Sequence, residues 1–223
     1  MVKDIGNRIL ILSVQDELAN PDELAVIKTS LEKYTTGAIV YDDMTTRPGY
    51  EDLDTAAYFA RQCNADAILA FGSRTTFHAA RAVALLANND IFAADLPNAS
   101  FPLKRDPHPI ISVPTGPAMG EESTPAFSIY NHDHRNSFHA HDNRLFPAMI
   151  FIDPNISANM PASDLARSGI AVMSAAVETI LSKKSNEITN SIALRALELI
   201  TRNLTTVKTA PGTHAARMTV TMA

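Results

Sequence analysis

The feature that most constrains the fold is an alternation of short aliphatic runs with amphipathic segments over the first half of the chain. The run Arg8–Val14 has no helical period, which is typical of a strand buried on both faces of a parallel sheet. Similar runs follow at 38–41, 67–71 and 109–113, separated by segments with helical spacing of apolar residues at 23–34, 50–64 and 75–88. This alternation predicts an α/β, Rossmann-like parallel sheet with helical crossovers.

The pattern changes twice in the second half of the chain. Two strand-like runs, 127–130 and 148–152, flank a polar segment rich in histidine and predict a hairpin. Two segments with an apolar helical face follow, and a further helical pattern begins after Pro211. We predict two domains: a Rossmann-like α/β domain at 1–160 and an incomplete, all-helical lobe at 161–223.

The composition is that of a globular protein, with 46% hydrophobic and 19% charged residues. The net charge of -5 comes from interspersed acids and bases, so the concentrated basic face that nucleic acid requires is not predicted. Neither end resembles a signal peptide. We expect a cytoplasmic protein that binds neither nucleic acid nor a membrane. The single cysteine, Cys63, is predicted to be a small core side chain in a helix.

A turn containing one glycine, Gly72-Ser73-Arg74-Thr75, joins the third predicted strand to its helix. Glycine lets a backbone approach a phosphate, and a helix N-terminus presents free N–H groups and positive dipole charge. Arg74 would attract a phosphate and Thr75 keeps a hydroxyl, whereas the Cβ atoms of Ser73 and Arg74 hinder a close approach. Two interpretations of this turn remain open: a dinucleotide-binding site that departs from the usual glycine-rich sequence, and a turn that binds no ligand.

Several segments resemble, in order, the motifs of the iron-containing alcohol dehydrogenase family. Residues 72–84 resemble G-G-G-S-x-x-D-x-A-K-x-x-A, residues 113–122 are similar to V-P-T-T-A-G-T-G-S-E, and residues 169–178 are similar to G-x-D-A-L-x-H-A-x-E. Asp153-Pro154 and Met160-Pro161 extend the match. The resemblance implies NAD(P) as the cofactor, bound by residues of the two turns: Gly72, Ser73, Arg74, Thr75, Thr115 and Gly116.

Departures from the family pattern weaken the nucleotide site that the resemblance implies. Only Gly72 remains of the three glycines in the turn. His78 and Arg81 stand at the family's acidic and lysine positions, and Val14 stands at an acidic position that would contact a ribose.

The implied metal site is affected more strongly. Ala171 and Ala175 stand where the family has an Asp and a His one helical turn apart. The family's other two histidines would lie beyond Ala223, since the chain lacks nearly all the later helices. We therefore expect neither iron nor zinc at the family site, and we assign no catalytic residue.

The polar segment carries two H-x-H pairs, His132 with His134 and His139 with His141. Residues i and i+2 of a strand share a face, so each pair could chelate an ion and a hairpin could unite the two pairs. We favour a solvated polar loop with adventitious affinity for Zn²⁺ or Ni²⁺, because nothing predicts the supporting hydrogen bonds of a functional site. Glu121 and Glu122 are predicted to complement the dipole at a helix N-terminus.

Three hypotheses about function follow. The first is a dehydrogenase-like pseudoenzyme that has lost metal-dependent oxidoreductase activity and serves as a non-catalytic or assembly subunit. Its uncovered apolar helix faces would associate in a homo-oligomer or with a complementary chain. The alternatives are an NAD(P)-dependent alcohol or aldehyde oxidoreductase completed by a partner chain, and a nucleotide- or metal-binding module.

Overall fold

The computed structural model describes residues 4–14, 21–89, 91–98, 104–117, 120–153, 155–156, 160–210 and 212–223. The chain divides into two compact units. Unit 1 comprises Met1–Val113 and Glu121–Phe151, and unit 2 comprises Pro114–Gly120 and Ile152–Ala223. The sequence-based predictions also used residues that lie outside the described ranges, namely Ala118, Met119, Pro154 and Pro211.

Unit 1 is built on a five-stranded sheet of order β2-β1-β3-β4-β7. Strand β1 pairs in parallel with both β2 and β3, and β4 pairs in parallel with β7. The α/β prediction is therefore confirmed. The strands are β1 (Arg8–Val14), β2 (Gly37–Met44), β3 (Ala67–Gly72), β4 (Ile110–Pro114) and β7 (Met149–Ile150).

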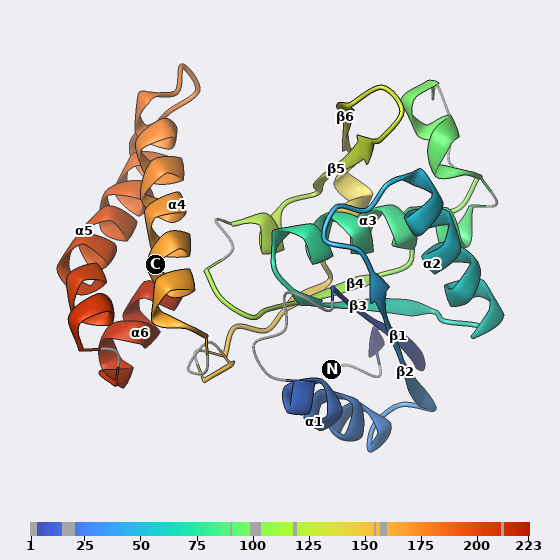
Figure 1. The fold of residues 1–223 in the computed structure, drawn as a ribbon. Coiled ribbons are helices and arrows are strands. Elements are labelled where there is room, and N and C mark those ends of the chain that lie inside the picture. The colour runs from blue at the N-terminus through green and yellow to red at the C-terminus, as the bar shows by residue number, and fades with distance from the viewer. Residues whose placement is uncertain are drawn as a thin grey trace. The chain divides into compact units, whose positions relative to one another are not determined.

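Helices cover both faces of this sheet, with α2 and α3 on one face and α1 on the other (Figure 1). Their bounds are α1 (Pro21–Glu32), α2 (Tyr50–Gln62) and α3 (Arg74–Asn88). This double cover explains why β1 is an unbroken aliphatic run, since Ile9, Leu10, Ile11 and Leu12 are all fully buried. The described part of the unit also contains the short 3₁₀ helices η3 (Ala93–Asn98), η4 (Glu121–Ser123) and η5 (Asn143–Leu145).

A two-stranded antiparallel hairpin, β5 (Ala126–Asn131) and β6 (Asn136–His141), packs against α3 through β5. The predicted hairpin was wrong in its second strand, because the histidine-rich segment itself forms β6 and Met149–Ile150 joins the main sheet as β7. No residue of β6 is buried, so the strand lacks the apolar alternation that a sequence pattern reveals.

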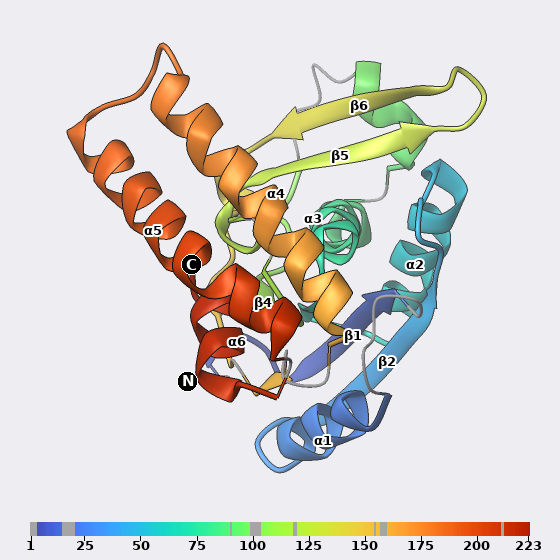
Figure 2. The same cartoon turned by 60° about the vertical axis from the view of Figure 1, so that its left-hand side comes forward.

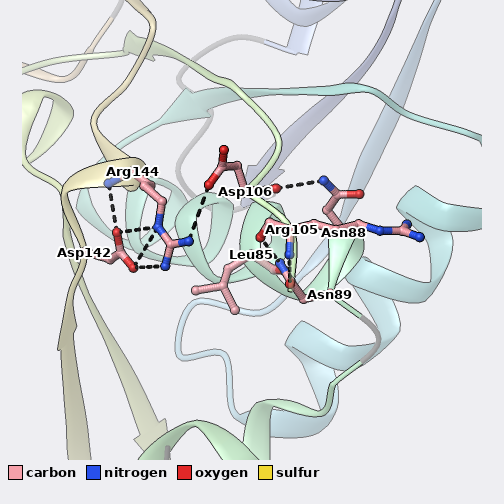
Figure 3. A network of polar contacts seen from close by, with 7 residues as sticks. All are labelled: Leu85, Asn88, Asn89, Arg105, Asp106, Asp142 and Arg144. Atoms are coloured by element: carbon pink, nitrogen blue, oxygen red, sulfur yellow. Dashed lines mark hydrogen bonds and ion pairs between the residues drawn. The ribbon is translucent and has the colours of Figure 1, made fainter. Parts of the chain in front are cut away.

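A network of hydrogen bonds and ion pairs connects the end of the hairpin to the loop that follows α3 (Figure 3). Nη2 of Arg144 lies 2.7 Å from Oδ2 of Asp142, and Nη1 of Arg144 lies 3.4 Å from Oδ1 of Asp106. The backbone carbonyl of Asp106 accepts a hydrogen bond of 2.7 Å from Nδ2 of Asn88, in the last turn of α3. The network therefore links η5 and its cap Asp142, which directly follows β6, to the end of α3.

Several local predictions need correction. The sequence predicts Asn20 or Asp22 as the cap of the first helix; Asp22 instead lies in the first turn of α1, and Asn20 lies outside the described residues. Gly37, which the sequence predicts to end the first helix, is the first residue of β2, five residues beyond the end of α1 at Glu32. Cys63 is partly exposed, because α2 ends at Gln62 and the cysteine occupies the C-cap.

Unit 2 consists mainly of three helices, α4 (Ala162–Leu181), α5 (Glu187–Thr209) and α6 (His214–Thr221), and α4 and α5 lie side by side (Figure 2). Their core contains Leu165, Val207, Ala216 and Val220. Gly169 lets the helices approach closely, because a Cβ atom there would lie 2.9 Å from Cδ1 of Leu204 and 3.3 Å from Cγ1 of Val220. Six apolar side chains of α4 and α5 remain exposed: Ile170, Val177, Leu181, Ile188, Ile192 and Leu194.

Candidate functional site

The strand order places a topological switch point between β1 and β3. The chain passes from β1 to β2 on one side and then to β3 on the other. In open parallel sheets, ligands bind at the carboxyl ends of the strands at such a point. The predicted turn Gly72-Ser73-Arg74-Thr75 follows β3 at this edge, with Gly72 ending the strand and Arg74 beginning α3.

The turn keeps its glycine for a packing reason. A Cβ atom on Gly72 would lie 2.8 Å from Cβ of the buried Thr76, in the first turn of α3. The first intrahelical hydrogen bond runs from the N–H of Phe77 to the carbonyl of Ser73, at 3.1 Å. The N–H groups of Arg74 and Thr75 therefore have no acceptor within the helix, and the positive end of α3 faces out of the turn.

A pocket of about 280 Å³ opens at this helix end. The loop after β2, the first turns of α3 and the hairpin all contribute to its walls. None of the lining residues is acidic, counting the described part of the chain. They are Thr46, Arg47, Pro48, Arg74, Thr75, His78, Ser128, Tyr130 and Ser137.

Beside the pocket, the carboxylate of Glu121 is surrounded by three basic residues of α3. Its Oε1 lies 3.3 Å from Nε of Arg74, and its Oε2 lies 3.2 Å from Nε2 of His78. The hydrogen bond from His78 lowers the pKa of Glu121, burial opposes this shift, and the charges of His78, Arg74 and Arg81 support it. As predicted, Glu121 and Glu122 lie at the start of a helix, the short η4, and Glu121 in addition pairs with side chains of α3.

Arg81 is the most deeply buried of these bases, at 1% exposure. Its Nη2 donates a hydrogen bond to the backbone carbonyl of Glu121. Burial lowers the pKa of Arg81 to about 10, and the charges of Glu121 and Glu122 oppose that shift. Arg81 thus holds η4 against α3 and does not line the pocket.

The contacts of His78 define where its proton lies. Nδ1 accepts a hydrogen bond of 2.6 Å from the backbone N–H of Ser128, so in the neutral ring Nε2 carries the proton and donates it toward Glu121. His78 therefore bridges η4 and β5.

The six predicted nucleotide-binding residues fall into both units. Gly72, Ser73, Arg74 and Thr75 lie together in unit 1, whereas Thr115 and Gly116 lie in unit 2. Thr115 is buried at 2% exposure, and a Cβ atom on Gly116 would meet the side chain of Met160. The structure adds Arg47 and Tyr130 to the candidates. Arg47 could have been found from the sequence, because it lies in a polar loop directly after the second predicted strand. No local sequence pattern indicated Tyr130.

The four histidines of the hairpin have different surroundings. Nε2 of His132 donates to the backbone carbonyl of Arg47 at 3.0 Å, and Nδ1 of His139 lies 2.7 Å from Oγ of Ser128. His134 lies in the turn and His141 at the far end of β6, opposite Ala126. Among the described residues, no three His, Cys, Asp or Glu side chains form a group able to hold a metal ion.

The two positions at which the motif match predicts missing metal ligands lie on α4. Ala171 and Ala175 lie one turn apart on α4, and both are partly exposed. A methyl group offers no lone pair, so this part of α4 supplies no ligand.

No helix within the described ranges is long and apolar enough to cross a membrane.

The doubly covered parallel sheet, with a basic pocket at its switch point, defines a protein of the Rossmann-like α/β class. The family model for iron-containing alcohol dehydrogenase matches residues 1–154. The chain belongs to the iron-containing alcohol dehydrogenase family, as the motifs predicted.

Curated relatives include alcohol dehydrogenase 4 of Saccharomyces cerevisiae, 24% identical over 80% of this chain and 46% of its own length. Maleylacetate reductase of Sphingobium indicum is 25% identical over 96% of this chain and 53% of its own length. The chain spans about half the length of the curated relatives it matches.

Solved structures show the same fold. Sulfoacetaldehyde reductase of Bifidobacterium kashiwanohense, in complex with NAD⁺, superposes with a TM-score of 0.88 at 21% identity, covering 99% of this chain and 58% of that one. An iron-containing alcohol dehydrogenase of Thermotoga maritima gives a TM-score of 0.87 at 24% identity, covering 99% of this chain and 60% of that one.

Proposed function

We propose that this chain is a non-catalytic member of its family that binds NAD(P) in the pocket at the start of α3 and acts as an assembly subunit. The observation that carries the proposal is the position of a basic, hydroxyl-lined pocket at the switch point of the sheet. Such a place combines free N–H groups, positive dipole charge and guanidinium groups, all of which favour phosphate.

The residues of the first turn of α3 fit a pyrophosphate. The side chain of Arg74 is 58% exposed, so it can reach a ligand although Glu121 shares its charge. Thr75 adds a hydroxyl and a backbone N–H at the same helix end. The pocket is at the small end of the range for ligand sites, so it suits one part of a dinucleotide and not the whole. NAD(P) supplies or accepts a hydride when it is bound to a dehydrogenase.

The non-catalytic part of the proposal rests on α4. Ala171 and Ala175 offer no metal ligands, so these two positions cannot hold the Lewis acid that would polarise an alcohol oxygen. Binding of a dinucleotide without metal-dependent turnover is the expected behaviour of the isolated chain.

Titration of the purified chain with NADH, followed by nicotinamide fluorescence and calorimetry, tests the binding. We expect saturable binding that Arg74→Gln weakens about tenfold, the effect of losing one charge-assisted contact. Arg195→Gln removes a similarly exposed arginine of α5 that pairs with Glu198, and it serves as the matched control. Absence of binding by NADH, NADPH and ADP-ribose alike would contradict the proposal.

A second candidate function is an oxidoreductase completed by a partner chain. The exposed apolar side chains of α4 and α5, with Leu181 at 78% and Ile188 at 75% exposure, favour it. Native mass spectrometry of the protein from its own host tests this candidate. A co-purifying chain together with bound iron would support it, whereas a metal-free homo-oligomer would support the assembly subunit.

A further inference from the structure

Arg47 lies in the loop that follows β2, at the same edge of the sheet as the start of α3. It lines the same pocket as Arg74 and Thr75, although it comes from a different crossover. Strand β1 separates β2 from β3, so the ends of these two strands are about 10 Å apart. Arg47 and the N-terminus of α3 are therefore two separate positively charged positions in one pocket.

The charge of Arg47 is available to a ligand. No carboxylate in the described part of the chain lies within ion-pair distance of its guanidinium group, in contrast to Arg74, which pairs with Glu121. The Cζ atom of Arg47 lies 3.9 Å from the centroid of the Tyr130 ring. An aromatic face orients a guanidinium group without neutralising it, so the donors at the rim of the group stay free.

The backbone of Arg47 is also held in place. Its carbonyl accepts a hydrogen bond of 3.0 Å from Nε2 of His132, at the turn of the hairpin. Pro48 follows directly and restricts the backbone of the loop. Arg47 is thus positioned from both sides before any ligand arrives, which lowers the entropic cost of binding.

We infer that Arg47 binds a phosphate group on the ribose of the dinucleotide, so that the pocket prefers NADP(H) to NAD(H). This inference rests on the proposed binding of a dinucleotide. In α/β dinucleotide sites, the pyrophosphate lies at a helix N-terminus, an acidic residue recognises a free 2′-hydroxyl, and a nearby arginine accommodates a 2′-phosphate. The family resemblance puts the ribose-contacting acidic residue at Val14, at the end of β1, where this chain has no acid to repel a 2′-phosphate. With the pyrophosphate on the first turn of α3, Arg47 in the loop after β2 is the second cation that a 2′-phosphate would meet. The fork of a guanidinium group matches the oxygens of a phosphate monoester.

Calorimetric titration of the whole chain with NADPH and NADH, and with adenosine 2′,5′-bisphosphate and adenosine 5′-monophosphate, tests the inference. We expect each 2′-phosphorylated ligand to bind about tenfold more tightly or better than its counterpart, as one charge-assisted hydrogen-bonded contact provides. Arg47→Gln should reduce both affinity ratios to near one. It keeps the backbone carbonyl that His132 contacts, so the loop should retain its structure.

Arg105→Gln is the matched control, because it removes the same charge from unit 1 at a residue that does not line the pocket. Equal affinities for NADH and NADPH in the unchanged protein would overturn the inference and leave the proposed function intact. Absence of binding by every nucleotide would overturn both. Inorganic phosphate that binds as tightly as adenosine 2′,5′-bisphosphate would show a general anion site and would also overturn the preference.

Discussion

The backbone N–H of Ser128 donates a hydrogen bond of 2.6 Å to Nδ1 of His78, and this contact joins the hairpin to α3. The other ring nitrogen faces Glu121, so one buried imidazole links β5, α3 and η4. Residues of α3 and β5 line the pocket, and η4 lies beside it. The stability of the site therefore depends on a small polar cluster as well as on apolar packing.

Replacement of His78 with leucine is expected to destabilise unit 1. The change leaves the N–H of Ser128 without its acceptor and removes a donor from Glu121, at a position that is only 9% exposed. Loss of these contacts should cost about 2–4 kcal/mol in the free energy of unfolding. Urea denaturation measures it. His134→Leu, at an exposed turn position, is the control and should have little effect.

Glu121 should make the stability of unit 1 depend on pH in the acidic range. Its folded-state pKa lies below the usual 4.5, chiefly because His78 donates a hydrogen bond to it. The stabilisation is therefore present above pH 4.5 and is lost as the pH falls through the lower, folded-state pKa. Glu121→Gln should lower stability at pH 7 by about 1–3 kcal/mol and flatten this acidic dependence.

Thermal unfolding of the two proteins from pH 7 to pH 3 tests this prediction. Glu198→Gln on α5 changes an exposed carboxylate in unit 2, and it should leave the stability nearly unchanged. An unaltered acidic slope in the Glu121→Gln protein would show that another group controls the transition.

The close approach of α4 to its neighbours should make Gly169 sensitive to a larger side chain. Even a Cβ atom there would come within 2.9 Å of Leu204 and 3.3 Å of Val220. Gly169→Val adds two further methyl groups and should cost about 1–3 kcal/mol through overpacking. Chemical denaturation checks the cost. Gly37→Val is the comparison, because a Cβ atom at Gly37 meets nothing within 4 Å.

Association is expected to depend on the exposed apolar side chains of α5. Ile188 and Ile192 are 75% and 66% exposed, and burying them against a second chain would remove apolar surface from water. The double change Ile188→Ser and Ile192→Ser should shift the sedimenting species toward the monomer. Val26→Ser removes an equally exposed aliphatic side chain from α1 and should not. The prediction would be refuted if the protein without substitutions sedimented as a monomer at all concentrations.

Much of the fold follows from local pattern. The run Arg8–Val14 was recognisable as a buried strand because every residue after Arg8 is apolar or small and is buried in the sheet. The segment Asn136–His141 was not recognisable as β6, because an exposed strand at the edge of a sheet needs no apolar face. Of the residues that line the pocket, Arg74 and Thr75 were candidates from the sequence because they follow a strand in a motif. Arg47 and Tyr130 meet because the hairpin returns to the loop after β2.

The sequence by itself determined the alternation of strands and helices, the order of the family motifs and the absence of ligating side chains at Ala171 and Ala175. These are properties of composition and local periodicity, which neighbouring residues carry. Only the tertiary structure decided that His78 would meet Ser128, 50 residues away, and that Arg81 would meet Glu121, 40 residues away. Such contacts depend on the path of the whole chain, because the burial of apolar faces first fixes the elements in space and polar partners are then selected by proximity.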